Sequence, residues 1–322
     1  MMRVLVYGAG AVGSALGGML AAHGDEVTLL GRAPHLHAVR ERGLRISGLW
    51  GDRTVPGLRT ATSLAELVPP AEFDWVFLSV KAYHTADAAR ALLPILRPKT
   101  FLCAFQNGLG NYDALIYHLP PERVALGRVI FGAELAPGHV TITVWADDVL
   151  VGSPDARFPK ARLAQLAERL TAAGVKTRVS QDITGALWAK ALYNCALNGL
   201  ATLYEVPYGG LLDRAPARRM MRQVVDEAYA VAEAHRVRLE PASADRYHEL
   251  LITTLVPDTA AHFPSMLRDV QRARPTEIES INGAIVALGR QVGVPTPANA
   301  LLTRLIHEKE RLGGSPRARA TT

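Results

Sequence analysis

Three polar residues recur at helical spacing within an apolar stretch of the chain. Residues 187–198 read LWAKALYNCALN, and this run is apolar nearly all the way round, which predicts a buried helix. Lys190, Asn194 and Asn198 fall at i, i+4 and i+8, so they form one polar stripe on that helix. Because burying an unpaired amide costs about 2–7 kcal/mol, we expect the stripe to line a polar site where Lys190 donates a proton to a reacting oxygen. The alternative is a lysine that snorkels to water beside two structural asparagines.

A glycine-rich motif near the start of the chain has the spacing of a dinucleotide-binding loop. Residues 8–13 read GAGAVG and follow the β-branched run RVLVY at residues 3–7. In this pattern Gly8 permits a tight turn, Gly10 lets a pyrophosphate approach the backbone, and Gly13 permits close packing of the helix that follows. The residues that complete the loop are Ala9, Ala11 and Val12. A glycine turn that serves packing alone is the alternative.

The end of the second predicted strand, EVTLL at residues 26–30, indicates which dinucleotide is bound. An NAD-binding chain places Asp or Glu at this end to hold the ribose 2′-hydroxyl, whereas this chain continues with Gly31 and Arg32. An arginine suits a 2′-phosphate through bidentate, charge-assisted hydrogen bonds. The sequence therefore predicts NADP(H) as the cofactor, the alternative being an arginine that is only solvated.

Two further segments are expected at the same edge of the sheet. Predicted strands at residues 73–80 and 100–105 are followed by Lys81 and by QNGLG at residues 106–110. Because the carboxyl ends of parallel strands share one edge, we expect Lys81 and Asn107 to contact the cofactor and the substrate. A solvated lysine and an ordinary Asn-Gly turn are the alternatives.

The pattern of predicted elements changes near residues 180–182. Before this point short strands alternate with helices, which predicts a doubly wound parallel α/β sheet, extended by antiparallel strands at residues 129–134, 139–145 and 149–152. After it come helical patterns at residues 184–203, 216–235, 243–255, 276–292 and 297–311. We predict an NADP-binding Rossmann-type domain over residues 1–180, an all-helical substrate domain over residues 181–312 and a disordered tail over residues 313–322.

The composition is that of a globular protein: 49% of the 322 residues are hydrophobic and 20% are charged. The net charge of +6 comes largely from dispersed arginines and suits anionic small ligands, and the absence of a basic stripe with interleaved aromatics argues against nucleic acid. No apolar run reaches about 18 residues, so no membrane span is predicted. Cys103 and Cys195 lie in apolar segments, which favours buried free thiols and the reducing cytoplasm. No metal site is predicted, and a homodimer is the expected assembly.

Several motifs together resemble the ketopantoate reductase (2-dehydropantoate 2-reductase) family. They are GAGAVG at 8–13, VKAYHT at 80–85, QNGLGN at 106–111, LWAKALYNCALN at 187–198, SMLRDV at 265–270 and TEIESINGAIV at 276–286. They span nearly the whole chain in the order of the family. The resemblance implies a Rossmann domain, a helical domain and an active site between them. It also implies NADPH-dependent reduction of ketopantoate to pantoate, a step toward pantothenate and coenzyme A.

The resemblance further implies roles for individual residues. Lys190 would be the general acid, and Asn194 and Asn198 would hold the substrate. Ser265 would bind the substrate carboxylate, while Glu277 would contact the substrate hydroxyl and pair with Lys190. The residues that would complete the site are Asn107 and Lys81. On its own, Ser265 is equally a helix N-cap, and Glu277 is equally a surface carboxylate near a helix N-terminus.

Three positions depart from the family pattern, all on the substrate side. Arg268 stands where the family usually has glutamine, and His262 stands at the position of a substrate-contacting asparagine. Gly199 replaces the proline that commonly follows the last asparagine of the helix. Two alternatives therefore remain open: a reductase of another small 2-oxo acid on the same scaffold, and a non-catalytic sensor that binds NADP.

Overall fold

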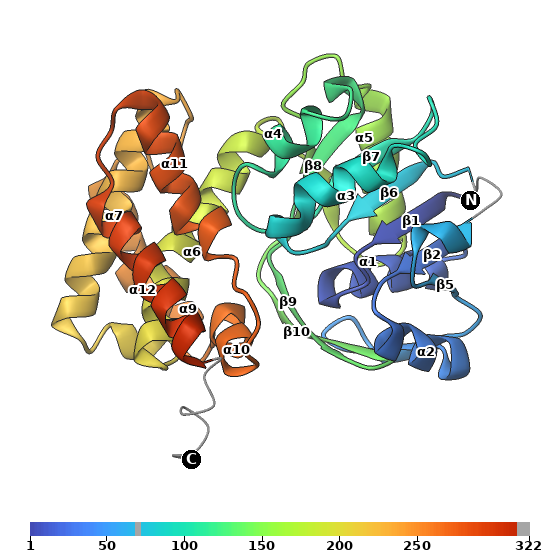
Figure 1. The fold of residues 1–322 in the computed structure, drawn as a ribbon, viewed down its shortest axis with the longest axis horizontal. Coiled ribbons are helices and arrows are strands. Elements are labelled where there is room, and N and C mark those ends of the chain that lie inside the picture. Colours follow the sequence, from blue (N-terminus) through green and yellow to red (C-terminus); the bar gives the residue numbers. More distant parts are fainter. Residues whose placement is uncertain (68–71, 314–322) are drawn as a thin grey trace. The chain divides into compact units, whose positions relative to one another are not determined.

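The computed structural model describes residues 1–67 and 72–313, so residues 314–322 of the predicted tail lie outside the described residues. The chain forms two compact units, each visible in Figure 1. The first unit comprises Met1–Gln106 and Asn111–Ile183, and the second comprises Asn107–Gly110 and the chain from Thr184 on. Four residues of the QNGLG motif therefore belong with the second unit, although they precede residue 180 in the chain.

The first unit is built on a mainly parallel sheet with the strand order β12-β11-β8-β7-β6-β1-β2-β5. Its strands are β1 (Arg3–Tyr7), β2 (Glu26–Leu30), β5 (Arg59–Ala61), β6 (Trp75–Leu78), β7 (Phe101–Ala104), β8 (Val124–Arg128), β11 (Val149–Gly152) and β12 (Thr177–Val179). Neighbours from β5 to β8 run parallel, and β11 runs antiparallel to β8. Every residue of β6 and β7 is buried, as expected for parallel strands covered on both faces. The predicted α/β sheet is confirmed.

The helices of the first unit alternate with these strands. They are α1 (Ala11–Ala22), α2 (Ala33–Arg42), α3 (Thr85–Leu92), α4 (Asn111–Ile116) and α5 (Lys160–Ala172), with 3₁₀ turns at Leu64–Leu67, Ala82–His84 and Pro121–Arg123. Helix α1 begins at the end of the glycine motif, as predicted. The element order therefore places a loop or helix N-terminus directly after each parallel strand.

A second sheet, which the sequence did not predict, has the order β4-β3-β10-β9. Its strands are β3 (Leu44–Gly48), β4 (Arg53–Val55), β9 (Phe131–Ala136) and β10 (His139–Trp145). The prediction that residues 129–134 and 139–145 extend the main sheet was wrong. Strand β10 pairs antiparallel with β9 and in parallel with β3. Because β3 lies far earlier in the chain, a local sequence pattern does not show this pairing. Strand β11, by contrast, does extend the main sheet through β8.

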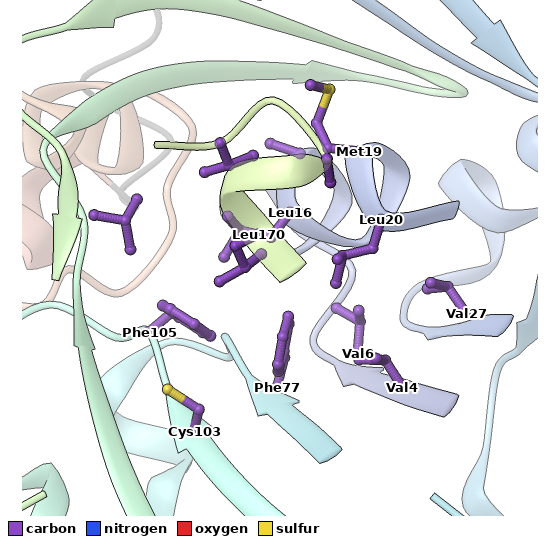
Figure 2. Packing of buried hydrophobic residues seen from close by; sticks show 14 of the residues in the cluster. Val4, Val6, Leu16, Met19, Leu20, Val27, Phe77, Cys103, Phe105 and Leu170 are labelled. Carbon is purple, nitrogen blue, oxygen red and sulfur yellow. The ribbon is translucent and has the colours of Figure 1, made fainter. Parts of the chain in front are cut away.

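Helix α1 packs against both sheets and is buried over most of its length. A Cβ atom at Gly17 would lie 2.8 Å from Val6 Cγ2 of the main sheet, and one at Gly18 would lie 2.7 Å from Leu44 Cδ2 of the second sheet. Glycine at these positions lets the helix backbone approach both sheets closely. Figure 2 shows the surrounding core, in which the labelled side chains are Val4, Val6, Leu16, Met19, Leu20, Val27, Phe77, Cys103, Phe105 and Leu170.

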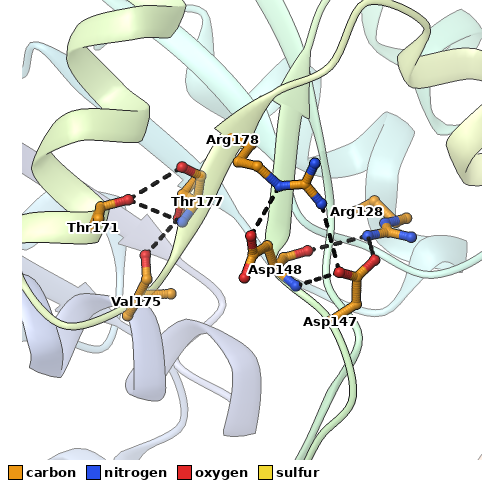
Figure 3. A network of polar contacts seen from close by, with 7 residues as sticks. All are labelled: Arg128, Asp147, Asp148, Thr171, Val175, Thr177 and Arg178. Atoms are coloured by element: carbon orange, nitrogen blue, oxygen red, sulfur yellow. Dashed lines mark hydrogen bonds and ion pairs between the residues drawn. The ribbon is translucent and has the colours of Figure 1, made fainter.

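Charged and hydroxyl groups fix the β11–β12 end of the main sheet (Figure 3). Arg128 Nη2 donates to Asp147 Oδ2 at 2.5 Å, and Arg178 Nε donates to Asp148 Oδ2 at 2.8 Å. The backbone N–H of Thr177 donates to Thr171 Oγ1 at 2.9 Å, which attaches β12 to α5. These contacts anchor the strand that ends shortly before the chain enters the second unit.

The second unit contains helices, turns and loops but no strand within its described residues. Its helices are α6 (Ile183–Tyr204), α7 (Ala215–Ala234), α8 (Ala244–Leu250), α9 (Val256–Asp258), α10 (Ser265–Gln271), α11 (Asn282–Val292) and α12 (Pro297–Gly313), with 3₁₀ turns at Tyr208–Leu211 and Ile278–Ser280 and a π-helical turn at Leu251–Leu255. Helix α6 is largely buried, as its apolar sequence predicted. Cys103 and Cys195 are free and buried, as predicted, and burial raises the pKa of both thiols. No helix within the described residues is long and apolar enough to cross a membrane.

One helix begins later than the sequence predicted. The pattern over residues 276–292 suggested a continuous helix, but α11 begins at Asn282. Ile281 has φ −106° and ψ −97°, which lies outside the helical region, so the helix does not extend back. The backbone oxygen of Glu277 accepts a hydrogen bond from Ser280 Oγ at 2.9 Å, and such side-chain bonds compete with regular helix. Glu277 therefore lies on a turn and not on the helix.

Candidate active site

The polar stripe on α6 lies where the sequence placed it. Lys190 and Asn194 are half-buried, and Asn198 is buried. Lys190 Nζ donates to Asn107 Oδ1 at 2.6 Å, a partly buried hydrogen bond. The structure thus brings together two predicted site residues that are far apart in the chain. An amide oxygen orients an ammonium group without neutralising its charge, since the amide itself is uncharged.

Asn194 lies one helical turn from Lys190 and one from Asn198. Its side chain makes no hydrogen bond with any other described residue, although it is half-buried on a helix that otherwise packs into the core. Its amide therefore keeps both its donor and its acceptor for a ligand or for water. This arrangement favours a binding role for the stripe over a structural one.

Tyr208 holds Asn198 in a defined orientation. Tyr208 Oη donates to Asn198 Oδ1 at 2.5 Å, which leaves the amide NH₂ as the group that can donate to a ligand. The phenol ring lies 5.2 Å from the ring of His262 and 5.8 Å from that of Tyr193, measured between ring centroids. Burial raises the pKa of Tyr208, so its hydroxyl remains protonated as the donor. Tyr208 was not predictable from the sequence, because its hydrogen-bond partner Asn198 is brought to it only by the fold.

Glu277 is buried and lies next to the 107–110 loop. Its backbone oxygen accepts from the backbone N–H of Ser280 at 3.1 Å, and Ser280 O accepts from the backbone N–H of Leu109 at 2.8 Å. Gly108 has φ +82°, and a Cβ atom there would lie 2.3 Å from Ser280 O. Glycine is therefore required for the close approach. The loop that brings Asn107 to Lys190 is docked on the turn that carries Glu277.

Ser265 is the exposed first residue of α10, and Pro264 occupies the N-cap position in its place. The described residues show no hydrogen bond between the Ser265 side chain and the α6 stripe. His262, which departs from the family pattern, accepts through its backbone oxygen from the N–H of Tyr208 at 3.0 Å. It therefore neighbours the residue that holds Asn198. Arg268 is exposed on α10.

In the first unit, the carboxyl ends of the central strands lie side by side. Tyr7 of β1 pairs with Leu30 of β2 and with Leu78 of β6, and Leu78 pairs with Ala104 of β7. The segments that follow these strands begin at a common edge, where ligands of open α/β sheets bind. This edge carries the glycine motif, Arg32 and Lys81 within the first unit.

Gly8 and Gly13 are required by packing. Gly8 has φ +106°, and a Cβ atom there would lie 2.5 Å from Val80 N. A Cβ atom at Gly13 would lie 2.4 Å from Ser79 Oγ, the hydroxyl of which donates to Gly8 O at 2.8 Å. The turn after β6 is thus pressed against the glycine loop.

Gly10 differs, because a Cβ atom there would meet nothing closer than Gly8 O at 4.0 Å. It occupies the N-cap position of α1, where no side chain caps the helix and the first turn holds no acidic residue. The first backbone N–H groups of a helix have no partners within the helix, and the dipole makes this end positive. An anionic group such as a pyrophosphate would be stabilised at this helix end, so the binding interpretation of Gly10 stays a prediction.

Arg32 is the exposed N-cap residue of α2, directly after β2. Its side chain makes neither a hydrogen bond nor an ion pair with another described residue. Lys81 is half-buried and precedes the 3₁₀ turn Ala82–His84. Gln106 Nε2 supports that turn by donating to Val80 O at 3.0 Å and to Thr85 Oγ1 at 2.7 Å. The motif around Gln106 was recognisable in the sequence, but the hydrogen bonds by which Gln106 supports the 3₁₀ turn were not.

His35 is a further residue that the sequence analysis missed. It is buried on α2, with Nε2 3.0 Å from Ser14 Oγ on α1 and Nδ1 accepting from the backbone N–H of Gly138 at 3.1 Å. It ties α2, and with it Arg32, to the helix that follows the glycine motif. No local pattern identifies this histidine, since its two partners, Ser14 and Gly138, lie far from it in the chain.

Comparison with known proteins places the chain among ketopantoate reductases. Residues 4–155 match the family model Ketopantoate reductase PanE/ApbA, and residues 182–310 match Ketopantoate reductase PanE/ApbA C terminal. A 2-dehydropantoate 2-reductase of Aquifex aeolicus is 38% identical over 311 residues, covering 96% of this chain and 97% of that protein.

Solved structures agree with these matches. A PanE/ApbA family ketopantoate reductase from Ralstonia eutropha JMP134 has a TM-score of 0.86 at 33% identity, covering 98% of this chain and 100% of that one. A D-mandelate dehydrogenase with NADH and anilino(oxo)acetate also has a TM-score of 0.86, at 28% identity, covering 97% of this chain and 99% of that one. The chain therefore belongs to the ketopantoate reductase PanE/ApbA family of NAD(P)-dependent oxidoreductases.

Proposed function

We propose that this protein reduces 2-dehydropantoate (ketopantoate) to pantoate with NADPH, a step of pantothenate and coenzyme A biosynthesis. The observation that carries the proposal is the hydrogen bond from Lys190 Nζ to Asn107 Oδ1 at 2.6 Å. It orients an ammonium group on the same helix face as two asparagine amides. Reduction of a carbonyl needs a proton donor for the carbonyl oxygen and hydrogen-bonding groups that hold the substrate, and this helix face carries both.

When bound at the glycine loop of the first unit, NADPH would supply the hydride that the substrate carbonyl carbon accepts. As negative charge develops on the carbonyl oxygen, the Lys190 ammonium stabilises it and then donates a proton from Nζ to that oxygen. The product is the 2-hydroxy acid, and Lys190 regains a proton from solvent. Asn107 keeps the ammonium group oriented throughout.

The remaining polar residues hold the substrate. The NH₂ group of Asn198, oriented by Tyr208, donates to a substrate oxygen, and the amide of Asn194 donates to the substrate hydroxyl or carbonyl. Ser265 binds the substrate carboxylate. Glu277 accepts a hydrogen bond from the substrate hydroxyl.

The first unit holds the cofactor. The glycine loop binds the pyrophosphate through backbone N–H groups at the N-terminus of α1, and Arg32 binds the 2′-phosphate. The loop residues are Gly8, Ala9, Gly10, Ala11, Val12 and Gly13. Lys81 and Asn107 contribute to the nicotinamide and substrate side.

The direct test is NADPH oxidation at 340 nm with ketopantoate beside pyruvate, 2-oxoisovalerate and acetoacetate. We expect a preference for ketopantoate by at least about tenfold in kcat/KM, a discrimination that substrate hydrogen bonds readily supply. Equal turnover of the smaller acids would contradict the assignment of ketopantoate as the substrate. The proposal that the protein is an NADPH-dependent reductase would still stand. No turnover with any of the acids, together with intact NADPH binding, would favour the sensor.

A larger 2-oxo acid is the second candidate substrate. His262 replaces an asparagine and packs against Tyr208, and the chain is similar in structure to a D-mandelate dehydrogenase. Phenylglyoxylate, the 2-oxo acid of mandelate, therefore belongs in the same panel. A preference for it would replace ketopantoate in the proposal and leave the role of Lys190 unchanged.

The cofactor proposal is tested at Arg32. We expect wild-type protein to favour NADPH over NADH, and Arg32→Ala to raise the KM for NADPH at least about tenfold while changing the KM for NADH little, because NADH has no 2′-phosphate. Arg42→Ala is the matched control, since Arg42 is exposed on the same helix. Equal use of both cofactors by the wild type would contradict the assignment of NADPH.

We also propose that the protein is a cytoplasmic homodimer, the commonest closed assembly. Light scattering coupled to size-exclusion chromatography would show about twice the chain mass of 34.7 kDa. A mass equal to one chain would contradict the dimer.

A further inference from the structure

His307 on α12 bridges two carboxylates of the second unit. Its Nε2 lies 2.7 Å from Glu279 Oε1, and its Nδ1 lies 2.9 Å from Glu310 Oε2. Ionised carboxylates only accept hydrogen bonds, so both contacts are hydrogen bonds only when both ring nitrogens carry hydrogen. The bridge is therefore complete only with the imidazolium form of His307.

Both carboxylates hold the turn that precedes α11. Glu279 is part of that turn, and Glu310 Oε1 accepts from the backbone N–H of Thr276 at 2.7 Å. His307 therefore contacts residues 276–280 at two places. Through Glu310 it is linked to the backbone N–H of Thr276, and it contacts the side chain of Glu279 directly. Glu277, the buried carboxylate of the candidate site, lies between these two attachment points.

The same turn supports the loop that orients Lys190. Ser280 O accepts from the N–H of Leu109, and two residues earlier Asn107 Oδ1 accepts from Lys190 Nζ. A shift of the turn would therefore move Glu277 directly and Asn107 through the loop. All of these contacts lie within the second unit.

We propose that protonated His307 is a positioning residue for the reduction, holding residues 276–280 so that Glu277 and Asn107 keep their places relative to Lys190. His307 acts through the turn and does not itself touch the reacting groups. The inference rests on the proposed function and deepens it, because it adds a pH-dependent support to the same site.

The charges around the ring set the pH range of this support. The charged groups that contact the ring are Glu279 from the turn and Glu310 from α12, each within hydrogen-bond distance of one ring nitrogen. The hydrogen bond to Glu279 is the chief cause that raises the pKa of His307. A histidine with a raised pKa in the folded state contributes its bridge in full below its ordinary pKa near 6.5. The bridge is lost as the pH rises through the raised pKa.

The test compares His307→Gln with His307→Arg across a pH series, measuring kcat, the KM for ketopantoate and the Kd for NADPH. At pH 6 we expect His307→Gln to lower kcat about tenfold, an effect on the order expected when a catalytic group is misplaced by a fraction of an ångström. The ratio of wild-type to variant kcat should fall toward one at alkaline pH, where His307 of the wild type is neutral. His307→Arg keeps a cation with several donors, so it should restore most of the activity at all pH values. The Kd for NADPH should stay the same in both variants.

Lys309→Gln is the matched control, since Lys309 lies on the same helix and pairs with Glu205 at 2.7 Å, away from the turn. It should leave kcat unchanged. Glu279→Gln removes one arm of the bridge at an exposed position and should lower the His307 pKa measured by NMR titration, with a smaller loss of kcat at pH 6. A loss in His307→Gln that is equal at every pH, or no loss at pH 6, overturns the inference.

Amide hydrogen exchange separates this inference from the proposed function. If wild-type protein reduces none of the tested acids, the proposed function fails, and the bridge is then read from exchange of a peptide containing Thr276, corrected for intrinsic rates. Faster exchange in His307→Gln at pH 6, and equal exchange at a pH above the His307 pKa measured by NMR titration, would confirm that His307 holds the turn. Equal exchange at both pH values overturns it.

Discussion

At the scale of single residues, the amide of Asn107 decides how Lys190 is presented. It accepts one N–H of the ammonium group at 2.6 Å and leaves the positive charge in place. A charged donor in a partly buried site stabilises a developing alkoxide far better than one in bulk water, because the local dielectric is lower. Catalysis by Lys190 thus depends on both its charge and its orientation.

Removing the Lys190 amine should separate chemistry from cofactor binding. We expect Lys190→Ala to lower kcat by roughly 10²–10⁴, the usual contribution of general acid catalysis, and to leave the Kd for NADPH nearly unchanged. Steady-state kinetics and a fluorescence titration with NADPH would measure the two quantities. Asn107→Ala should lower kcat less, and the double variant should show strong coupling between the two residues. An unchanged kcat in Lys190→Ala would remove this residue from the catalytic role.

Residue types in local patterns were predictable, whereas their contacts were not. Helical spacing alone placed Lys190 and Asn194 on one face of α6, and the glycine spacing located the turn after β1. The partners of His307 and Tyr208 belong to other elements, so no window of sequence shows them. Glu277 was assigned to a helix because hydroxyl-to-backbone bonds in the turn carry no periodic signal.

At the scale of elements, helix α1 packs between the two sheets of the first unit. It packs against β1 and β2 of the main sheet and against β3, β9 and β10 of the second sheet. The glycine motif predicted the first of these surfaces. The second was missed because β4 spans only three residues and because β10 pairs with β3, which lies far back in the chain. Gly17 and Gly18, two adjacent small residues in one helix, were the available signal for a helix enclosed on both sides.

A side chain at Gly17 should therefore destabilise the first unit. We expect Gly17→Val to lower the free energy of unfolding by about 1–3 kcal/mol through overpacking, since its Cβ atom would lie 2.8 Å from Val6 Cγ2 and 3.0 Å from Leu29 Cδ2. Urea unfolding followed by circular dichroism would measure the change. Ala22→Val, at the exposed end of the same helix, should cost less than about 1 kcal/mol. Similar losses in both variants would show that α1 is not tightly enclosed.

At the scale of the whole molecule, stability should respond to acid through His35. Its Nδ1 accepts from the N–H of Gly138, so the neutral ring carries its hydrogen on Nε2 and donates to Ser14 Oγ. Burial is the chief cause that lowers the pKa of His35 below its ordinary value. The folded protein thus favours the neutral ring, whereas the unfolded chain protonates it near pH 6.5. Stability is lost as the pH falls below about 6.5 toward the lowered pKa.

Replacing His35 should remove part of this acid sensitivity. We expect the midpoint of thermal unfolding of wild-type protein to fall between pH 7.5 and pH 5 by more than that of His35→Gln, which has no group to protonate there. His37→Gln, an exposed change on the same helix, should follow the wild type. A parallel acid loss in wild type and His35→Gln would assign the sensitivity to other groups.

The alternation of strands and helices predicted the α/β class because it follows from local hydrophobic patterns. The membership of residues 107–110 in the second unit was not predictable in the same way, since it depends on the docking of Gly108 and Leu109 against Ser280. Residues 107–110 lie within the first unit in chain order but belong to the second unit in space. Local sequence patterns show chain order and not spatial neighbours.

That loop has a consequence for any attempt to divide the protein by a single cut. A fragment that begins at Thr184 would contain Lys190 and Glu277 but would lack Asn107 and the N–H of Leu109. Its ammonium group would be unoriented even in a well-folded helical fragment. Activity would return only when a fragment spanning residues 1–183 supplies both the remaining unit of the protein and this loop in trans.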